Sequence, residues 1–301
     1  MNDYVAIKSS HIVIIGLGLM GGSLALALRG KCQKIEAVDP DENVVTYAQQ
    51  NGIVDFASTK FYEEISLNDI IILAASVKTI LTLLDHLTEY HHGTPVVLDL
   101  GSTKAEIVSK MNELPERFDP IGGHPMCGKE KSSIFHADAN LFQGAIFALT
   151  PLQRTSDRAC SLAEQLVMAV GANPLWIEAD THDRWVAATS HVPYLISNAL
   201  VYVTPTDATP LIGPGFRSST RLAGSSIQMM GDILETNRLN VLTSLRRFQE
   251  HLKVLEDLLD STNYDLLTQT LESGAQRYYS SMIIDQDAEN KDLNLEHRIN
   301  E

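Results

Sequence analysis

The clearest chemical signal in the sequence is a glycine-rich turn close to its start. Gly16, Gly18 and Gly21 form a G-x-G-x-x-G pattern that follows an apolar run and opens a helical segment. In such a pattern the first glycine permits a tight turn, the second lets the backbone approach a diphosphate, and the third lets helix and strand pack closely. The turn therefore predicts a dinucleotide site. Its binding residues are expected to be Gly16, Leu17, Gly18, Leu19, Met20 and Gly21.

An acidic residue at the end of the next apolar run indicates which dinucleotide is bound. Asp39 occupies that position, where a carboxylate accepts hydrogen bonds from the ribose hydroxyls and repels a 2′-phosphate. The residues that follow, 40–42, include no arginine. The pattern therefore favours NAD over NADP. Ala75 and Ser76, which end a later apolar run, are expected to line the same nucleotide.

A serine and a histidine lie where two further strands are expected to end. Ser102 belongs to the segment DLGSTK, residues 99–104, and is either functional or a cap for the helix that follows. His124 follows two glycines and precedes Pro125, which places it on a tight loop at the same sheet edge. A neutral imidazole titrates at about pH 6.5 and can accept a proton from a substrate hydroxyl. His124 is therefore the candidate base.

These residues need a sheet that brings several strand ends together. Short apolar runs alternate with amphipathic stretches, such as 43–52 and 77–92, up to about residue 180. Runs that are apolar almost throughout are typical of strands covered on both faces. The alternation predicts a doubly wound α/β sheet of the Rossmann type, parallel at least in its first half. The predicted strands cover residues 11–16, 34–39, 70–76, 96–102, 118–123, 145–150 and 174–179.

The pattern changes after Asp180, where strand signals nearly vanish and residues 182–203 are predicted to form one helix. A later helix carries an apolar seam with alternating steps of four and three residues, which is either intrachain core or a dimer interface. The seam comprises Val241, Leu245, Phe248, Leu252, Leu255 and Leu259. We expect a dinucleotide-binding domain over 1–180, an all-α domain over 181–282 and a disordered polar tail over 283–301.

Composition argues against several classes of protein. The 301 residues include 23 Lys and Arg against 38 Asp and Glu, and the formal charge of −15 disfavours nucleic acid as a partner. The three cysteines are odd in number and lack C-x-x-C spacing, so neither a disulfide framework nor a metal site is expected. No long apolar run and no apolar signal segment is visible in the sequence. We therefore expect a cytoplasmic protein without membrane contact.

Several motifs together resemble the prephenate/arogenate dehydrogenase family of tyrosine biosynthesis. The matching segments are GLGLMGGSLALAL, the D-x-x-S-x-K of residues 99–104, GGHPMCG of 122–128, His182-Asp183, SHVP of 190–193 and GFRSSTRLA of 215–223. The combination of GGHPMCG with SHVP is specific, whereas the glycine turn alone is not. The resemblance implies NAD(P)-dependent oxidative decarboxylation on a Rossmann domain, followed by a helical dimerisation domain that makes the protein a homodimer.

The resemblance also implies roles for individual residues. His124 would bind the C4 hydroxyl of the substrate ring and help to remove its proton, and Ser102 would hydrogen-bond the same hydroxyl. Arg221 would pair with a substrate carboxylate through its planar fork of donors. His191 would help to shape the substrate pocket. Asp183 is interpreted as a structural residue that favours the start of a helix.

Two positions depart from the family pattern. Tyr194, a candidate substrate-pocket residue, stands where many bacterial members have a second histidine, and Ser218 stands where many have an aspartate. Arg217, on the same loop as Arg221, is either a substrate contact or a salt-bridge residue. The missing acid slightly favours prephenate, because the ammonium group of arogenate loses a candidate partner. The missing histidine weakens anion binding and favours arogenate.

The predicted reaction is NAD-dependent oxidative decarboxylation of prephenate to 4-hydroxyphenylpyruvate, and the alternative is an arogenate dehydrogenase or an enzyme that accepts both substrates. A β-hydroxyacid dehydrogenase is disfavoured because that family needs a lysine on its interdomain helix, and residues 182–203 contain none. A non-catalytic NAD(H)-sensing regulator would keep the glycines and Asp39 but would need neither His124 nor Arg221. We also expect no further catalytic segment before the glycine turn and no ligand-sensing domain after residue 282.

Overall fold

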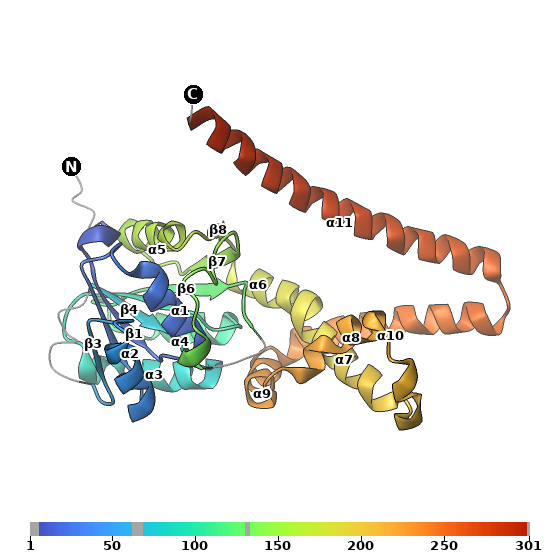
Figure 1. Ribbon diagram of the computed structural model, residues 1–301, viewed down its shortest axis with the longest axis horizontal. Coiled ribbons are helices and arrows are strands. Elements are labelled where there is room, and N and C mark those ends of the chain that lie inside the picture. Colours follow the sequence, from blue (N-terminus) through green and yellow to red (C-terminus); the bar gives the residue numbers. More distant parts are fainter. Residues whose placement is uncertain (1–5, 62–68, 130–132, 300–301) are drawn as a thin grey trace. The chain divides into compact units, whose positions relative to one another are not determined.

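The computed structural model describes residues 6–61, 69–129 and 133–299, with side chains described as far as residue 281. The chain divides into two compact units, Met1–Leu242 and Thr243–Glu301. The strands lie in the blue-to-green part of the chain, and the yellow-to-red part is helical (Figure 1). None of the described helices is both long enough and apolar enough to cross a membrane.

The first unit is built on an eight-stranded sheet in the order β3-β2-β1-β4-β5-β6-β7-β8. Neighbouring strands run parallel, except that β7 is antiparallel to β6. The chain order reverses between β1 and β4, where sheets of this type bind their ligands. The Rossmann-type sheet is therefore confirmed. The strands are β1 His11–Ile15, β2 Lys34–Val38, β3 Phe56–Ser58, β4 Ile70–Leu73, β5 Val96–Asp99, β6 Asp119–Pro125, β7 Ile146–Pro151 and β8 Asn173–Trp176.

Helices cover both faces of the sheet, which explains why the central strands have no polar face. In β1, Ile12 and Ile14 belong to one apolar cluster, and Val13 and Ile15 belong to another. The first cluster includes residues of α1, α2 and α5, and the second includes residues of α3 and α4. These helices are α1 Leu19–Leu28, α2 Glu42–Gln50, α3 Val77–Tyr90, α4 Ala105–Asn112 and α5 Asp157–Ala169.

The helix predicted over 182–203 contains an irregular turn. It consists of α6 (Ala179–Val186), a π-helical turn over Ala187–His191 and α7 (Val192–Val203). Such turns occur frequently at functional sites. The rest of the first unit includes a short 3-10 segment over Thr206–Leu211, α8 Pro214–Thr220, a 3-10 turn over Arg221–Gly224, α9 Ile227–Thr236 and the start of α10 Arg238–Asp260.

The first compact unit extends well beyond residue 180, where the sequence pattern changes. Tyr194 of α7 and two residues of α9, Met230 and Ile233, are buried in the apolar cluster that also contains α3 and α4. Lys78 of α3 adds a 2.6 Å ion pair with Glu235. The helices that follow the sheet therefore belong to the same compact unit up to Leu242. The compact units divide the chain after Leu242, whereas the sequence pattern changes after Asp180.

The second unit consists of the remainder of α10 and of α11 (Tyr264–Ile299). Much of the predicted apolar seam is exposed within the chain, including Phe248 at 37%, Leu252 at 53% and Leu259 at 55%. The seam beyond the start of α10 is therefore not intrachain core. The structure continues α11 to Ile299, which differs from the disordered tail expected from residue 283. Residues 285–299 contain neither glycine nor proline, so local propensity permits a continued helix.

Candidate active site

The glycine turn between β1 and α1 has the geometry that its sequence predicts. Gly16 adopts a φ of +99°, and a Cβ atom there would lie 2.5 Å from the carbonyl oxygen of Ala74. A Cβ atom on Gly21 would overlap the carbonyl oxygen of Gly16. Side chains at these two positions would therefore separate the turn from α1 and from the end of β4.

The start of α1 is open to a ligand. Gly18 is the residue that caps the helix, no side chain among the described residues caps its first turn, and a Cβ atom on Gly18 would meet nothing within 4 Å. Leu17 and Leu19 are buried, so their side chains belong to the core and only their backbone can contact a ligand. Exposed N–H groups and the positive end of the helix dipole favour a diphosphate at such a position.

Asp39 lies directly beside this turn. Its Oδ2 accepts the backbone N–H of Leu17 at 2.7 Å, and its Oδ1 accepts that of Asp41 at 3.0 Å. Each carboxylate oxygen has capacity for a further hydrogen bond, as the ribose hydroxyls of a dinucleotide require. Ala75 and Ser76 follow β4 next to Gly16, and Ser76 is the residue just before α3. The predicted cofactor residues therefore lie together, and their arrangement fits NAD.

The structure places Ser102 and His124 at one edge of the sheet. His124 lies near the end of β6, Ser102 follows β5, and these two strands are parallel neighbours. Both residues are half-buried. The alternative interpretation of Ser102 as a helix cap is wrong, because Lys104 holds the capping position of α4 and the carboxylate of Asp183 accepts its backbone N–H.

His124 is hydrogen bonded to a second histidine, which is bonded in turn to an aspartate. Nδ1 of His124 lies 2.9 Å from Nε2 of His182, and Nδ1 of His182 lies 2.8 Å from Oδ1 of Asp183. The same carboxylate accepts the backbone N–H groups of Lys104 at 2.7 Å and Ala105 at 2.9 Å. Asp183 therefore stabilises the start of α4 rather than the start of its own helix. Its side chain acts as the acceptor in all three bonds.

This chain of bonds assigns the protons of both imidazoles. Asp183 accepts, so Nδ1 of His182 donates. With one proton on each ring, Nε2 of His182 has no proton and accepts from Nδ1 of His124. Neutral His124 consequently keeps its own Nε2 unprotonated. The unprotonated Nε2 of His124 is therefore a proton acceptor at the same sheet edge as Ser102.

A buried ion pair fixes the backbone just before His124. The Lys104 side chain is fully buried, and its Nζ contacts the Asp99 carboxylate and donates to the carbonyl of Gly123 at 2.6 Å. Asp99 also accepts the backbone N–H groups of Gly101 and Gly123. Burial lowers the pKa of Lys104, and the charge of Asp99 opposes that effect. The pair therefore ties the ends of β5 and β6 together beneath the candidate base.

The surroundings keep two of these histidines neutral. Burial lowers the pKa of His124 well below its usual value, and His182, Lys104 and His191 lower it further. His191 lies in the π-helical turn, and burial lowers its pKa to about 4 despite the nearby charge of Asp183. Both imidazoles can therefore act as neutral hydrogen-bonding groups at neutral pH.

The remaining predicted residues lie on the helices that follow the sheet. Tyr194 is 8% exposed and packs within an apolar cluster, so its ring serves as core in this structure. Arg217 on α8 and Arg221, which begins the next 3-10 turn, are both exposed. That turn and α8 pack against α7. The predicted pairing of Arg221 with a substrate carboxylate stays a prediction.

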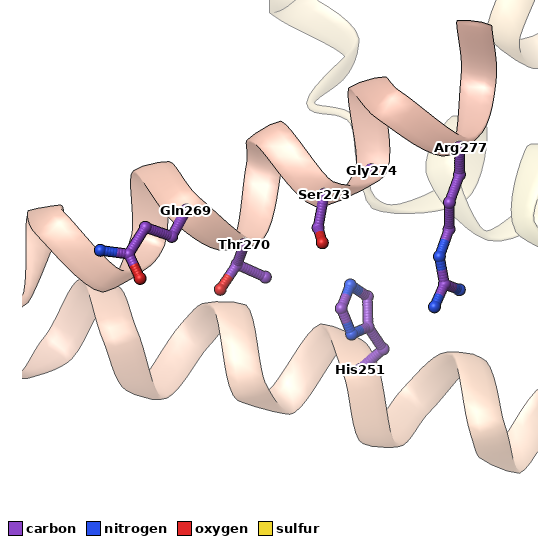
Figure 2. A pocket seen from close by; sticks show the side chains of 6 residues that line it. All are labelled: His251, Gln269, Thr270, Ser273, Gly274 and Arg277. Atoms are coloured by element: carbon purple, nitrogen blue, oxygen red, sulfur yellow. The ribbon is translucent and has the colours of Figure 1, made fainter. Parts of the chain in front are cut away.

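A separate pocket of about 430 Å³ lies between α10 and α11 in the second unit (Figure 2). Its lining residues are His251, Gln269, Thr270, Ser273, Gly274 and Arg277. None of them is a predicted site residue. Within the described residues, no group of three or more His, Cys, Asp or Glu side chains is arranged to hold a metal ion.

Four residues contribute to the site in ways that the sequence does not indicate. Lys104 stands in the quoted 99–104 motif, but nothing in its spacing indicates that the ammonium is buried. His182 and Asp183 were noted as a motif without the bond to His124. Asn237, which contacts His191, carries no motif signal at all.

Two family models match the chain. The model "Prephenate dehydrogenase, nucleotide-binding domain" matches residues 24–175, and "Prephenate dehydrogenase, dimerization domain" matches residues 178–273. The first match begins at residue 24, within α1, and does not include the glycine turn. The interpretation of that turn as a dinucleotide site therefore rests on its own geometry.

Characterised relatives and solved structures agree with these matches. A prephenate dehydrogenase of Bacillus subtilis is 32% identical over 82% of this chain and 68% of its own length, and one of Lactococcus lactis is 34% identical over 80% and 69%. Prephenate dehydrogenase of Aquifex aeolicus, crystallised with hydroxyphenyl propionate and NAD+, superposes with a TM-score of 0.84 at 27% identity, covering 92% of this chain and 99% of that one. Arogenate dehydrogenase of Synechocystis superposes with a TM-score of 0.78 at 28% identity, covering 89% and 99%.

Proposed function

The chain belongs to the prephenate dehydrogenase family, and from that premise we propose that it oxidises and decarboxylates prephenate to 4-hydroxyphenylpyruvate with NAD. The enzyme class and the cofactor follow from the family, from the NAD+ complex of the Aquifex relative, and from the fit of Asp39 and the glycine turn. Arogenate is the alternative substrate, because a structural relative of similar identity acts on it.

The observation that carries the proposal is the bonding of His124. Its Nδ1 donates to His182, so its Nε2 is available as a base at a sheet edge that also carries the dinucleotide turn. A passive dinucleotide-binding protein would not need an unprotonated imidazole held there by a second histidine and an aspartate.

The reaction needs one hydride acceptor and one proton acceptor. When bound, NAD+ supplies the hydride acceptor for the hydrogen on C4 of the substrate ring. Nε2 of His124 accepts the proton of the C4 hydroxyl, and Ser102 hydrogen-bonds the same oxygen. Loss of CO2 from C1 then makes the ring aromatic. The electron pair of the broken C–C bond passes through the ring to the C4 oxygen, which takes back a proton to give the phenol. Aromatisation supplies the driving force, so the protein chiefly orients C4 and removes the proton.

The other predicted residues complete the substrate site in this proposal. Arg221 pairs with a substrate carboxylate, and Arg217 supports that anion from the same segment. His191 and Tyr194 form part of the pocket wall, His191 through its imidazole and Tyr194 by packing α7 against the sheet.

The direct test measures NADH absorbance after purified protein is mixed with NAD and prephenate, with arogenate in a parallel reaction. We expect NADH and CO2 in equal amounts with prephenate and a lower kcat/KM with arogenate. A higher kcat/KM with arogenate would reverse the substrate assignment. Absence of NADH with both substrates would favour a sensing role.

We also propose that the protein is a cytoplasmic homodimer. The second family match is to a dimerisation domain, and the seam of α10 leaves Phe248, Leu252 and Leu259 exposed in a single chain. The functional division then falls near residue 180, between the two family matches, with the helical domain over 181–282. Light scattering should give twice the mass of the 33.2 kDa chain, and a monomeric mass would contradict the proposal.

A further inference from the structure

Asn237, between α9 and α10, is 3% exposed and makes several hydrogen bonds through its amide. Its Nδ2 donates to the backbone carbonyl of Asp183 at 2.7 Å and lies 3.3 Å from Nδ1 of His191. Its Oδ1 accepts from Nδ2 of Asn240 at 2.8 Å. A backbone carbonyl can only accept, so the bond to Asp183 identifies the amide end that faces His191 as the donor.

The orientation of this amide assigns the proton of His191. Nδ2 of Asn237 can only donate, so Nδ1 of His191 must accept. A neutral imidazole carries one proton, which must then be on Nε2. Burial lowers the pKa of His191 to about 4, so the ring is neutral at neutral pH and carries a single proton.

His191 and His124 therefore carry their protons on opposite nitrogens. His124 has its proton on Nδ1 because His182 accepts it, whereas His191 has its proton on Nε2. The two networks meet at Asp183, whose carboxylate holds His182 and whose carbonyl holds Asn237. His191 is also close enough for its charge to affect the pKa of His124. Two linked hydrogen-bond networks thus hold one histidine as a neutral acceptor and the other as a neutral donor.

We propose that Asn237 is a positioning residue that holds His191 as an Nε2–H donor for an oxygen of the substrate, next to the acceptor His124. The kinetic part of this proposal rests on the proposed dehydrogenase function, whereas the tautomer of His191 does not. Asn237 itself is not placed in contact with the substrate and acts through His191.

The tautomer can be measured by nitrogen NMR on the full-length protein labelled with ¹⁵N-histidine. The shifts of Nδ1 and Nε2 identify which nitrogen carries the proton, and His191→Gln identifies the signals of His191 among the 10 histidines. We expect the proton on Nε2 in the wild type. We expect the signals to move toward averaged values in Asn237→Leu, which supplies no donor. A proton on Nδ1 in the wild type would overturn the proposal.

A milder variant keeps the test valid if Asn237→Leu fails to fold. Asn240→Ala leaves Asn237 in place and removes the bond to its Oδ1. Its His191 signals should move in the same direction by a smaller amount. Glu235→Gln is the matched control, because it removes an exposed ion pair two positions from Asn237 without touching the amide. Unchanged His191 signals in both asparagine variants would contradict a positioning role.

Kinetics test whether Asn237 acts through His191. Asn237→Leu removes the amide that holds His191 as an Nε2–H donor. The substitution should therefore raise KM for prephenate about tenfold, with kcat changed less than about threefold. In a His191→Gln background the same substitution should change KM no further. An equal effect in both backgrounds would show a merely structural role and overturn the proposal. If the wild type forms no NADH from prephenate, the proposed function fails while the NMR experiment still decides the tautomer.

Discussion

The imidazole of His182 lies edge-on to that of His124, with 2.9 Å between Nε2 and Nδ1 and an angle of 71° between the rings. This geometry is that of a hydrogen bond between edge-on rings rather than a stacking contact. His182 thereby connects a histidine of the sheet to Asp183 at the start of the helical part of the chain. In the proposed mechanism, proton transfer at His124 therefore depends on how α6 packs against the sheet.

Removing the ring nitrogens of His182 should make His124 a less effective base while leaving His124 itself in place. His182→Phe keeps a ring in the buried position but leaves Nδ1 of His124 without its acceptor, so the tautomer and orientation of His124 are no longer fixed. We expect kcat to fall about 10- to 100-fold with little change in NAD affinity. Steady-state kinetics and NAD titration measure both. His86→Phe, at an exposed histidine, is the control, and an equal loss there would count against the network.

The acid side of the pH–rate profile should lie at unusually low pH. A base must be unprotonated, and burial together with His182, Lys104 and His191 lowers the pKa of His124 well below 6.5. The unprotonated form therefore persists as the pH falls through 6.5, and kcat should decline only below that value. Measurement of kcat at saturating NAD and prephenate across pH tests this, and an inflection at or above 6.5 would contradict it.

The buried pair beneath His124 should matter for stability. Lys104→Met removes the cation and leaves the Asp99 carboxylate buried, so the free energy of unfolding should fall by about 3–5 kcal/mol. Urea denaturation of the whole chain measures the change. Lys110→Met breaks exposed ion pairs with Asp85 and Glu113 and should leave the denaturation curve nearly unchanged. Equal denaturation curves for the two variants would show that the buried pair contributes no more to stability than the exposed pairs.

Arg221 should act on substrate binding rather than on the chemical step. A charge-assisted bond to a carboxylate contributes about 1.5–3 kcal/mol, so Arg221→Ala should raise KM for prephenate roughly 10- to 100-fold. The value of kcat should change much less. Arg184→Ala, at an exposed arginine of α6, is the matched control. An unchanged KM in Arg221→Ala would remove the carboxylate role.

The sequence predicts the sheet well because buried strands are continuous apolar runs, and each of the seven runs overlaps an observed strand. β3 was missed because Phe56–Ser58 is too short to form a pattern. The antiparallel direction of β7 leaves no local mark in the sequence, since it depends on pairing with β6. The π-helical turn before α7 likewise has a sequence that reads as ordinary helix.

Site residues could be predicted from the sequence only where a single short segment contains the complete motif. The glycine turn and Asp39 follow from spacing, and His124 follows from its glycines and its place at the end of a predicted strand. The structure extends β6 to Pro125, so His124 lies in the strand and not on the predicted loop. The bond from His124 to His182 joins residues 58 positions apart, and the bond from Asn237 to His191 joins residues 46 positions apart. Such pairs depend on how α6, α9 and the sheet pack, which periodicity does not reveal.

The most direct test of the base assignment is the kcat of His124→Asn with prephenate and NAD, measured beside the dissociation constant for NAD. Asparagine keeps a polar side chain at the end of β6 but cannot accept a proton. We expect kcat to fall by about 10² to 10⁴ with NAD binding unchanged. A kcat within about threefold of the wild type would show that His124 is not the base.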